Sequence, residues 1–535
     1  MGRKITCFRF LPGFLVFLSF LALCSGAEAE SFTGKTPLEP GPYGVGFESY
    51  ELFDNNRTVL SKYDYFGAPL EGKRVRPIQI CVWYPAEKTV DAPKMIIGEY
   101  NFPYPQNTEF IDYLSEIQNR DVGRLQAILR GDQGLVLDLL SYEVGACSDI
   151  PHAGGKFKMI VCGPDMRKGI LENSGLFEYL ASNGLVVATV HSVGSFDLNP
   201  SENPADLETL VRDTEFAMSF MKEQPYIDSD RICLLGYGTG AAAAILLQMR
   251  SFDIDAVVCV QGTFDDESIN EIMTRNPYFA IDRMNVPLLH LYKETGTSAG
   301  DTFIKRLRYS PRHTVKFAPD YDVLFTNYEL IASLKQDSTG QLSRQNIDGY
   351  KTSSLYALNF FRAHLSEDST ARSFLDDEAG ESSSKAGFLT VAFHPGDEIP
   401  PTESQFMSII NERGVETAAQ LYRKFKPSNP DHVFFREFNI NILGYRYLQT
   451  GRGRDALTLF ELNADAFPTS ANAWDSYGEA CMAIGDYPRA LENYRKALEI
   501  LPQDTNITEE LRNLIRENAP QQIARLEELI RESSE

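Results

Sequence analysis

A glycine-rich turn follows an apolar stretch near the middle of the chain and leads into a helix-forming stretch. The segments are RICLL (231–235), GYGTG (236–240) and AAAAILLQ (241–248). In a sharp strand-to-helix turn of the pattern G-x-S-x-G, the central serine is held exposed as a nucleophile. Here the flanking glycines are present, but the central residue is Gly238, which has no side chain. The pattern predicts a nucleophile turn without its nucleophile.

The same turn is compatible with two other chemistries. Thr239 has a hydroxyl next to Gly238, although a threonine at this place is also an ordinary helix-capping residue. If the pattern is extended to Ala241, the turn also matches G-x-G-x-x-G/A, whose glycines allow a pyrophosphate to approach a helix N-terminus. A dinucleotide site also requires an acidic residue at the end of the next strand, where this chain has Gln261. We therefore expect no dinucleotide and no other cofactor.

The flanking segments predict the framework that positions this turn. From about residue 43 to 365, short apolar runs alternate with helix-like stretches. This alternation is typical of a doubly wound, mostly parallel α/β sheet buried on both faces, with its functional crevice beyond the carboxyl ends of the strands. The runs predicted as strands are 76–84, 158–162, 186–190, 231–235, 256–260, 286–292 and 314–317. The segment 105–150 is predicted as a helical insertion over the sheet edge or the crevice mouth.

Residues 43–365 resemble the platelet-activating-factor acetylhydrolase and dienelactone-hydrolase branch of the α/β-hydrolases. The stretches that carry the resemblance are LASNGLVVATVHSVGS, LVRDTEFAMSFM and IDSDRICLLGYGTGAAAA, in that order and spacing. Proteins of that branch cleave small esters with a serine, an acid and a histidine in this chain order. The resemblance implies the α/β-hydrolase fold, and it makes the residues at the three triad positions decisive for function.

Carried over by this resemblance, the triad positions hold residues that cannot perform the family's chemistry. The nucleophile position is Gly238 and the acid position, after the next strand, is Gln261. The histidine position is Asp322 or, with a one-residue slip, Tyr321. Loss of triad members leaves only residual effects of binding and of the oxyanion hole. The sequence therefore predicts that no catalytic residue remains at these positions.

Other polar residues are expected around the crevice. The oxyanion turn, usually His-Gly, reads CGP (162–164), so Gly163 is retained without the histidine, and the Thr239 amide is the second expected donor. Asp165 could serve in another acid–base arrangement or be a solvated loop carboxylate. His191, at a strand end, and His290, within a strand, are more often hydrogen-bonded structural histidines than bases.

The chain changes character after residue 365. Residues 366–402 are rich in Ser, Asp, Glu and Gly and are predicted as a flexible linker. Beyond them, residues recur at the 34-residue period of tetratricopeptide repeats, which are pairs of helices. The recurring pairs are Gly444 and Gly478, Gly451 and Gly485, Ala456 and Ala490, Phe460 and Tyr494, and Pro468 and Pro502.

An all-α repeat domain is therefore predicted over 403–535, with clear units at 437–470 and 471–504. A degenerate preceding unit is indicated by Gly414, Ala419 and Tyr422, and an amphipathic tail, 511–530, would cap the end. Such stacks form a concave surface that binds a peptide or protein partner.

The first residues are predicted as a signal peptide, residues 1–29. Arg3 and Lys4 precede an apolar run and small residues, and a cut is expected before Glu30. Cys24 would suit a lipid anchor, but the bulky Leu23 before it argues against one. No other run approaches the ~18 apolar residues of a membrane span, so we expect an exported chain without a transmembrane segment.

The composition argues against two classes of ligand, nucleic acids and metal ions. A net charge of −23 repels phosphate backbones, so nucleic acid is not expected. No cysteine pair has metal-ligand spacing, and no metal is expected. Six cysteines follow the leader: Cys81, Cys147, Cys162, Cys233, Cys259 and Cys481. Four of them, at 81, 162, 233 and 259, lie in apolar strand-like runs, and the cysteines are expected to be buried thiols.

Two functions remain open from the sequence. The first is an exported pseudo-hydrolase that binds or scaffolds, with a small ester-like or lipid-like ligand in the crevice and a peptide or protein at the repeats. The alternative is a working ester or peptide hydrolase whose catalytic residues have moved.

Overall fold

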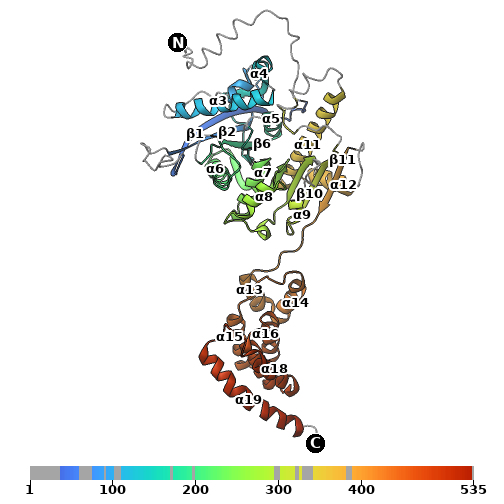
Figure 1. Ribbon diagram of the computed structural model, residues 1–535. Coiled ribbons are helices and arrows are strands. Elements are labelled where there is room, and N and C mark those ends of the chain that lie inside the picture. Colours follow the sequence, from blue (N-terminus) through green and yellow to red (C-terminus); the bar gives the residue numbers. More distant parts are fainter. Residues whose placement is uncertain are drawn as a thin grey trace, which may run out of the picture. The chain divides into compact units, whose positions relative to one another are not determined.

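The computed structural model describes residues 37–59, 75–89, 92–101, 110–129, 131–168, 173–195, 199–293, 302–319, 325–327, 330, 341–380 and 388–532. The chain divides into two compact units, residues 1–397 and 398–535. The first is built on a sheet and the second is helical (Figure 1). The predicted signal peptide, with Cys24, lies outside the described residues. No helix in the described ranges is long and apolar enough to cross a membrane.

The described part of the first unit forms an 11-stranded sheet in the order β3-β4-β1-β2-β6-β5-β7-β8-β9-β10-β11. The strands are β1 (Gly44–Thr58), β2 (Val75–Ala86), β3 (Lys94–Ile96), β4 (Glu143–Ser148), β5 (Phe157–Gly163), β6 (Leu185–His191), β7 (Ile227–Tyr237), β8 (Ala256–Val260), β9 (Leu288–Lys293), β10 (Arg312–Phe317) and β11 (Leu389–His394). From β6 to β10 all neighbours are parallel, whereas β2 is antiparallel to both β1 and β6. This mostly parallel sheet has the architecture of an α/β-hydrolase and confirms the predicted fold class.

Helices cover both faces of the sheet because its strands are apolar on both faces. Along β8, Ala256, Val258 and Val260 belong to one hydrophobic core, and Val257 and Cys259 to the other. The helices of the first core include α5 (Ser174–Ser182) and α11 (Gln341–Leu365). Those of the second include α6 (Pro204–Lys222), α7 (Thr239–Arg250) and α8 (Glu267–Thr274). The smaller helices are α2 (Ile97–Asn101), η3 (Ile281–Arg283) and α9 (Thr302–Lys305).

The inserted segment 105–150 contributes to the sheet edge and to the crevice side. It contains α3 (Ile111–Ile128), α4 (Gln133–Leu140) and β4, which pairs with β1 and β3. Two arginines of α3 donate to backbone carbonyls just beyond the ends of β5 and β6. Arg124 Nη2 lies 2.7 Å from Met166 O, and Arg120 Nη1 lies 3.1 Å from Ser192 O. The helix therefore lies against the loops that leave the carboxyl ends of these strands.

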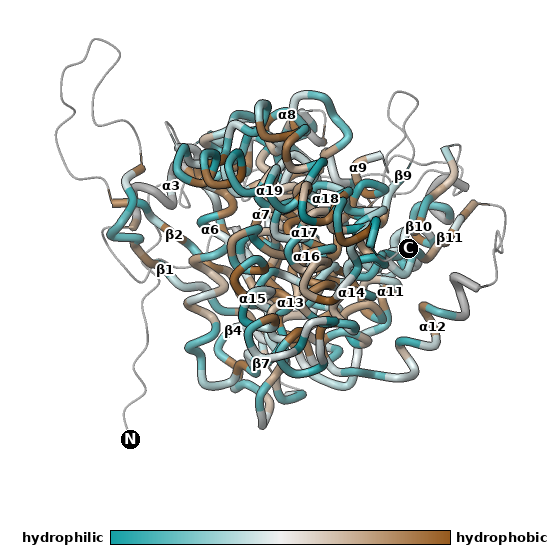
Figure 2. The backbone as a smooth tube through the Cα atoms, turned by 90° about the horizontal axis from the view of Figure 1, so that it is seen from below, coloured by the Kyte–Doolittle hydropathy of each residue, from teal (hydrophilic) through white to brown (hydrophobic). Residues whose placement is uncertain are grey.

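The prediction of a flexible linker over 366–402 was wrong for much of that segment. It contains α12 (Ser369–Gly380) and β11, which pairs antiparallel with β10 and extends the sheet. Apolar Leu389 and Val391 alternate with exposed residues along β11, and Leu375 of α12 is buried. The tube of α12 accordingly alternates between hydrophobic and hydrophilic residues (Figure 2). An average composition over the whole segment concealed these short periodic patterns.

The second unit consists of helix pairs, as the repeat pattern predicts. Its helices are α13 (Glu403–Arg413), α14 (Val415–Phe425), η5 (Lys426–Ser428), α15 (Glu437–Gln449), α16 (Gly453–Ala466), α17 (Ala471–Ala483), α18 (Tyr487–Ile500) and α19 (Glu509–Glu532). A Cβ atom on Gly444 would lie 2.6 Å from the Phe460 ring, and one on Gly478 would lie 3.1 Å from Tyr494. The recurring glycines therefore allow the paired helices to approach closely. Where a degenerate unit was predicted around Ala419, the chain forms the helices α13 and α14, and their identity as a repeat unit stays a prediction.

Candidate functional site

The glycine-rich turn joins β7 to α7 at the carboxyl edge of the sheet. Gly238 stands between the two elements with φ 52° and ψ −117°, a backbone conformation that L side chains rarely adopt. A Cβ atom on Gly240 would overlap the backbone carbonyl of Gly163, so glycine is also required there. The sharp strand-to-helix turn is therefore present, with its backbone close to the end of β5.

The space above Gly238 is occupied by a carboxylate. A Cβ atom placed on Gly238 would overlap Oδ2 of Asp165 and lie 2.8 Å from its Cγ. Asp165 is 7% exposed. Its other oxygen accepts from the backbone N–H of Arg167 at 2.8 Å, which fixes the carboxylate in the loop that follows β5. Asp165 therefore fills the position where a nucleophilic side chain would begin, and it is not the solvated loop carboxylate considered above.

Thr239 is a bridging residue in this arrangement. Its buried hydroxyl accepts from the N–H of Met166 at 2.8 Å and lies 3.4 Å from Oδ1 of Asp165, to which it donates. Both contacts tie the start of α7 to the β5 loop. The hydroxyl is thereby engaged in holding Asp165 rather than presented to the crevice.

The oxyanion turn has kept its position but lost a donor. Gly163 ends β5 and is the register partner of Gly236 on β7, so the turn lies beside the glycine-rich segment. The residue after Gly163 is Pro164, which has no backbone N–H to donate. An oxyanion hole in this fold combines the amide after the nucleophile with an amide of this loop. Pro164 cannot supply such an amide, and the Thr239 amide is the donor expected from the glycine-rich turn.

Gln261 lies near the glycine-rich turn 236–240, from here on called the elbow, but is engaged with the neighbouring strand. It follows β8 with φ 47°, and the N–H of Thr263, two residues later, lies 3.4 Å from Gly238 O. The Gln261 side chain accepts from the N–H of Lys293 at 2.8 Å, and its own N–H donates to Leu291 O at 2.9 Å. This neutral amide braces the ends of β8 and β9 and carries no charge that could orient a histidine.

The position expected for the histidine, Asp322 or Tyr321, lies outside the described residues. The described residues just after it are attached to α5. Asn327 accepts from the N–H of Gly175 at 3.1 Å, and Phe325 O accepts from the Asn173 amide at 2.9 Å.

A buried polar cluster that sequence reasoning did not identify lies at the end of β6. His191 is 3% exposed, and its Nδ1 is 3.4 Å from Oδ2 of Asp121 on α3. Arg120 and Arg124 flank Asp121 and contact it at 2.9 and 3.5 Å. Burial lowers the pKa of His191 to about 4, so it is neutral at pH 7. The pattern R-D-x-x-R within α3 could have indicated a charged cluster. Its contact with β6 joins residues far apart in the chain, so the sequence did not reveal it.

His290 is a packing residue. It is fully buried within β9, and its ring stacks 4.5 Å from Tyr292 and lies 5.1 Å from Phe264. The dinucleotide interpretation also meets an obstacle in this geometry, because a pyrophosphate at the start of α7 would face the Asp165 carboxylate. In the described ranges, no group of three or more His, Cys, Asp or Glu side chains could hold a metal ion.

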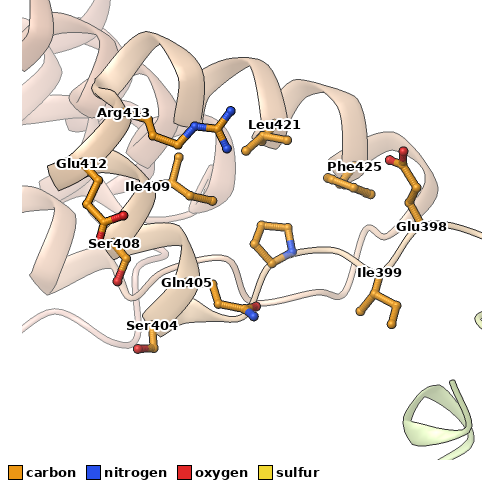
Figure 3. A pocket seen from close by; sticks show the side chains of 11 residues that line it. Glu398, Ile399, Ser404, Gln405, Ser408, Ile409, Glu412, Arg413, Leu421 and Phe425 are labelled. Carbon is orange, nitrogen blue, oxygen red and sulfur yellow. The ribbon is translucent and has the colours of Figure 1, made fainter. Parts of the chain in front are cut away.

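The helical unit has a groove of about 650 Å³ along α13 and α14 (Figure 3). Its apolar walls are formed by Ile409 of α13, Leu421 and Phe425 of α14, and Pro401 from the segment before α13. Polar side chains such as Glu412 line its edge. The groove is large enough for side chains of a peptide.

Known proteins resemble separate parts of the chain. Residues 214–306 match the family described as BAAT / Acyl-CoA thioester hydrolase C terminal, and residues 471–504 match the tetratricopeptide repeat. Among solved structures, a ferulic acid esterase from Streptomyces cinnamoneus aligns with a TM-score of 0.45 and 18% identity, over 63% of this chain and 94% of that one. No curated protein sequence matches the chain. The chain thus combines a hydrolase-like domain with a tetratricopeptide repeat, while the narrower acetylhydrolase branch stays a prediction.

Proposed function

We propose that this protein is an exported pseudo-hydrolase that binds or scaffolds other molecules through its crevice and its helical repeats. The observation that carries the proposal is the overlap between Asp165 and any side chain at position 238. A serine at that position needs open space above the turn, and here a fixed carboxylate fills it. Gln261 and Pro164 support the proposal as well, because a glutamine is not an acid and a proline has no backbone N–H to donate.

The proposed ligands are inferred from the parts of the fold that are retained. The crevice keeps its framework, and the ligand expected there is small and ester-like or lipid-like. The helical unit has a groove whose walls are apolar, which suits a peptide or protein partner. Export is supported by the pattern of residues 1–29 in the sequence.

Labelling with a fluorophosphonate probe tests the loss of catalysis. The wild-type full chain should show no covalent labelling and no hydrolysis of p-nitrophenyl acetate above buffer, because no serine stands at the elbow. Gly238→Ser alone should fold poorly, since its side chain collides with Asp165. Gly238→Ser with Asp165→Ala removes the collision, because the Cβ of Asp165 is 3.4 Å from the added atom.

That double variant should fold but label weakly, because it lacks a histidine base and an acid. Adding Gln261→Asp and Asp322→His should raise labelling above that of the double variant. Strong labelling of an unmodified serine in the crevice would contradict the proposal and identify a relocated nucleophile.

A second candidate, an ester or thioester hydrolase with relocated residues, is favoured by the family match over 214–306 and by the Asp165 carboxylate at the elbow. If Asp165 were its nucleophile or base, the wild type would hydrolyse an acyl ester or thioester. Asp165→Asn, which keeps the shape of the side chain, would then abolish that activity. Absence of turnover in both proteins supports the pseudo-hydrolase.

A further inference from the structure

Helix α15 leaves two apolar side chains exposed on one face. Phe438 is 71% exposed and Ile442, one turn later, is 43% exposed. The opposite face of the helix is buried in the core of the helical unit through Ile440, Leu443 and Tyr447. Helical spacing therefore separates the exposed pair from the packed face, and the pair forms an apolar patch without a partner in the described part of the chain.

The neighbouring helix α17 carries two carboxylates on the side where it meets α15. The Tyr445 hydroxyl of α15 donates to Glu479 Oε2 at 2.6 Å and lies 3.0 Å from Ser476 Oγ, so the two helices lie side by side here. Asp475 precedes Glu479 by one helical turn. Its Oδ1 atom is buried and has no hydrogen-bond partner among the described residues.

These two carboxylates form an uncompensated pair. Over the described ranges, no Lys or Arg nitrogen comes within 4.0 Å of either one. Like charges one turn apart on a helix destabilise it. Burial and the charge of Glu479 raise the pKa of Asp475 to about 7. A cation between them would remove the repulsion, and the described part of the chain does not supply one.

We propose that Phe438, Ile442, Asp475 and Glu479 form a docking surface, the α15–α17 face, for a partner segment that carries a Lys or Arg beside apolar side chains. Charge complementarity selects this occupant, since Glu479, and Asp475 where it is ionised, would repel an acidic or phosphorylated segment. The apolar pair contributes the buried contact area, and exposed aromatic residues of this kind are common anchors of interfaces.

The inference rests on the part of the proposed function that assigns partner binding to the helical unit. It does not depend on the elbow. Fluorophosphonate labelling tests the lost catalysis, and a binding measurement on α15 and α17 variants tests the docking surface, so either can fail without the other.

The test uses the full chain and fluorescein-labelled peptides that present leucines and lysines on one helical face. Two companion peptides replace the lysines by glutamates or the leucines by serines. Fluorescence anisotropy should show binding of the Leu/Lys peptide and much weaker binding of both companions. Phe438→Ala and Glu479→Gln should each weaken binding about tenfold or more, the effect of losing one anchor of ~1.4 kcal/mol. Glu479→Gln keeps an acceptor for Tyr445.

Matched variants control for the acidic character of the whole protein. Phe252→Ala removes a fully exposed phenylalanine from the other unit, and Glu492→Gln removes an exposed carboxylate from α18. Both should bind the Leu/Lys peptide as the wild type does. Equal binding of the Leu/Lys and Leu/Glu peptides would overturn the proposal, and so would equal losses in the control and test variants.

Discussion

At the scale of single residues, one buried carboxylate joins three elements of the first unit. Asp213 of α6 is fully buried and accepts from Arg76, at the start of β2, through both oxygens. It also lies 2.9 Å from Arg57 of β1 and accepts from the Ser192 hydroxyl at 2.8 Å. The ion pair is satisfied on every side, which is the condition under which a buried charge is tolerated.

Asp213→Asn should destabilise the first unit by about 3–5 kcal/mol, because it leaves Arg76 buried without its counter-charge. Urea unfolding followed by Trp83 fluorescence in a Trp474→Phe background isolates this unit. Asp253→Asn is the control, since its pair with Lys222 is exposed and such pairs contribute at most ~1 kcal/mol. A loss no greater than that of the control would show that Asp213 has no special role.

The sequence located the glycine-rich turn because a strand, a turn and a helix are encoded locally. It did not reveal what fills the turn, because Asp165 and Thr239 are 74 positions apart in the chain. The same holds for Asp121, whose partner His191 belongs to a distant strand. Local patterns predict where a site is built, whereas its chemistry depends on contacts that only the folded chain brings together.

At the scale of elements, helix α5 carries a buried carboxylate toward β4 and α2. Glu178 accepts from the N–H of Gly145 at 2.7 Å and from the Tyr100 hydroxyl at 3.0 Å. Burial raises its pKa from 4.5 to about 7 in the folded chain. The folded state therefore holds this proton more tightly than the unfolded state, and the associated stability is lost as the pH rises from about 4.5 through 7.

Glu178→Gln should remove this pH dependence. Relative to the wild type, the variant should gain up to about 3 kcal/mol between pH 5 and pH 8, because only the wild type must ionise a buried group. The measurement is the difference between their free energies of unfolding at the two pH values, again from Trp83. Glu87→Gln, at an exposed position, should show no such change, and a flat difference for Glu178→Gln would refute the shifted pKa.

The buried parallel strands could be predicted because each is a short apolar run. The elements toward the two ends of the sheet could not. Strand β1 is half-exposed and polar, and β11 and α12 lie in a segment whose average composition resembles a linker. Elements with one solvent-facing side carry a weaker hydrophobic signal, and their pairing is fixed by the strand they join.

At the scale of the whole molecule, two units with separate cores meet within the chain at residues 397 and 398. Asp397 is bound to the first unit by an ion pair with Arg308 at 2.5 Å, and the next residue, Glu398, pairs with Lys424 of the second. The change of unit thus takes place over one peptide bond. The repeat period predicted a boundary in this region, but not this position.

The proposal of export also belongs to this scale. Protein recovered from outside the cytoplasm should begin near Glu30, because the small residues at 27 and 29 fit a processing site. N-terminal sequencing of the exported material checks this. Exported protein that retains Phe14 would exclude the predicted cleavage.

The overlap between Asp165 and position 238 has a consequence for the protein's evolution. A mutation that returned a serine to position 238 would collide with Asp165. A mutation that removed Asp165 alone would leave the Arg167 amide without its acceptor and the turn still without a nucleophile. Because the two sites are in contact, their effects are not additive, and neither single step leads toward catalysis. If the protein is the pseudo-hydrolase proposed above, a return to serine catalysis requires substitutions at both positions together.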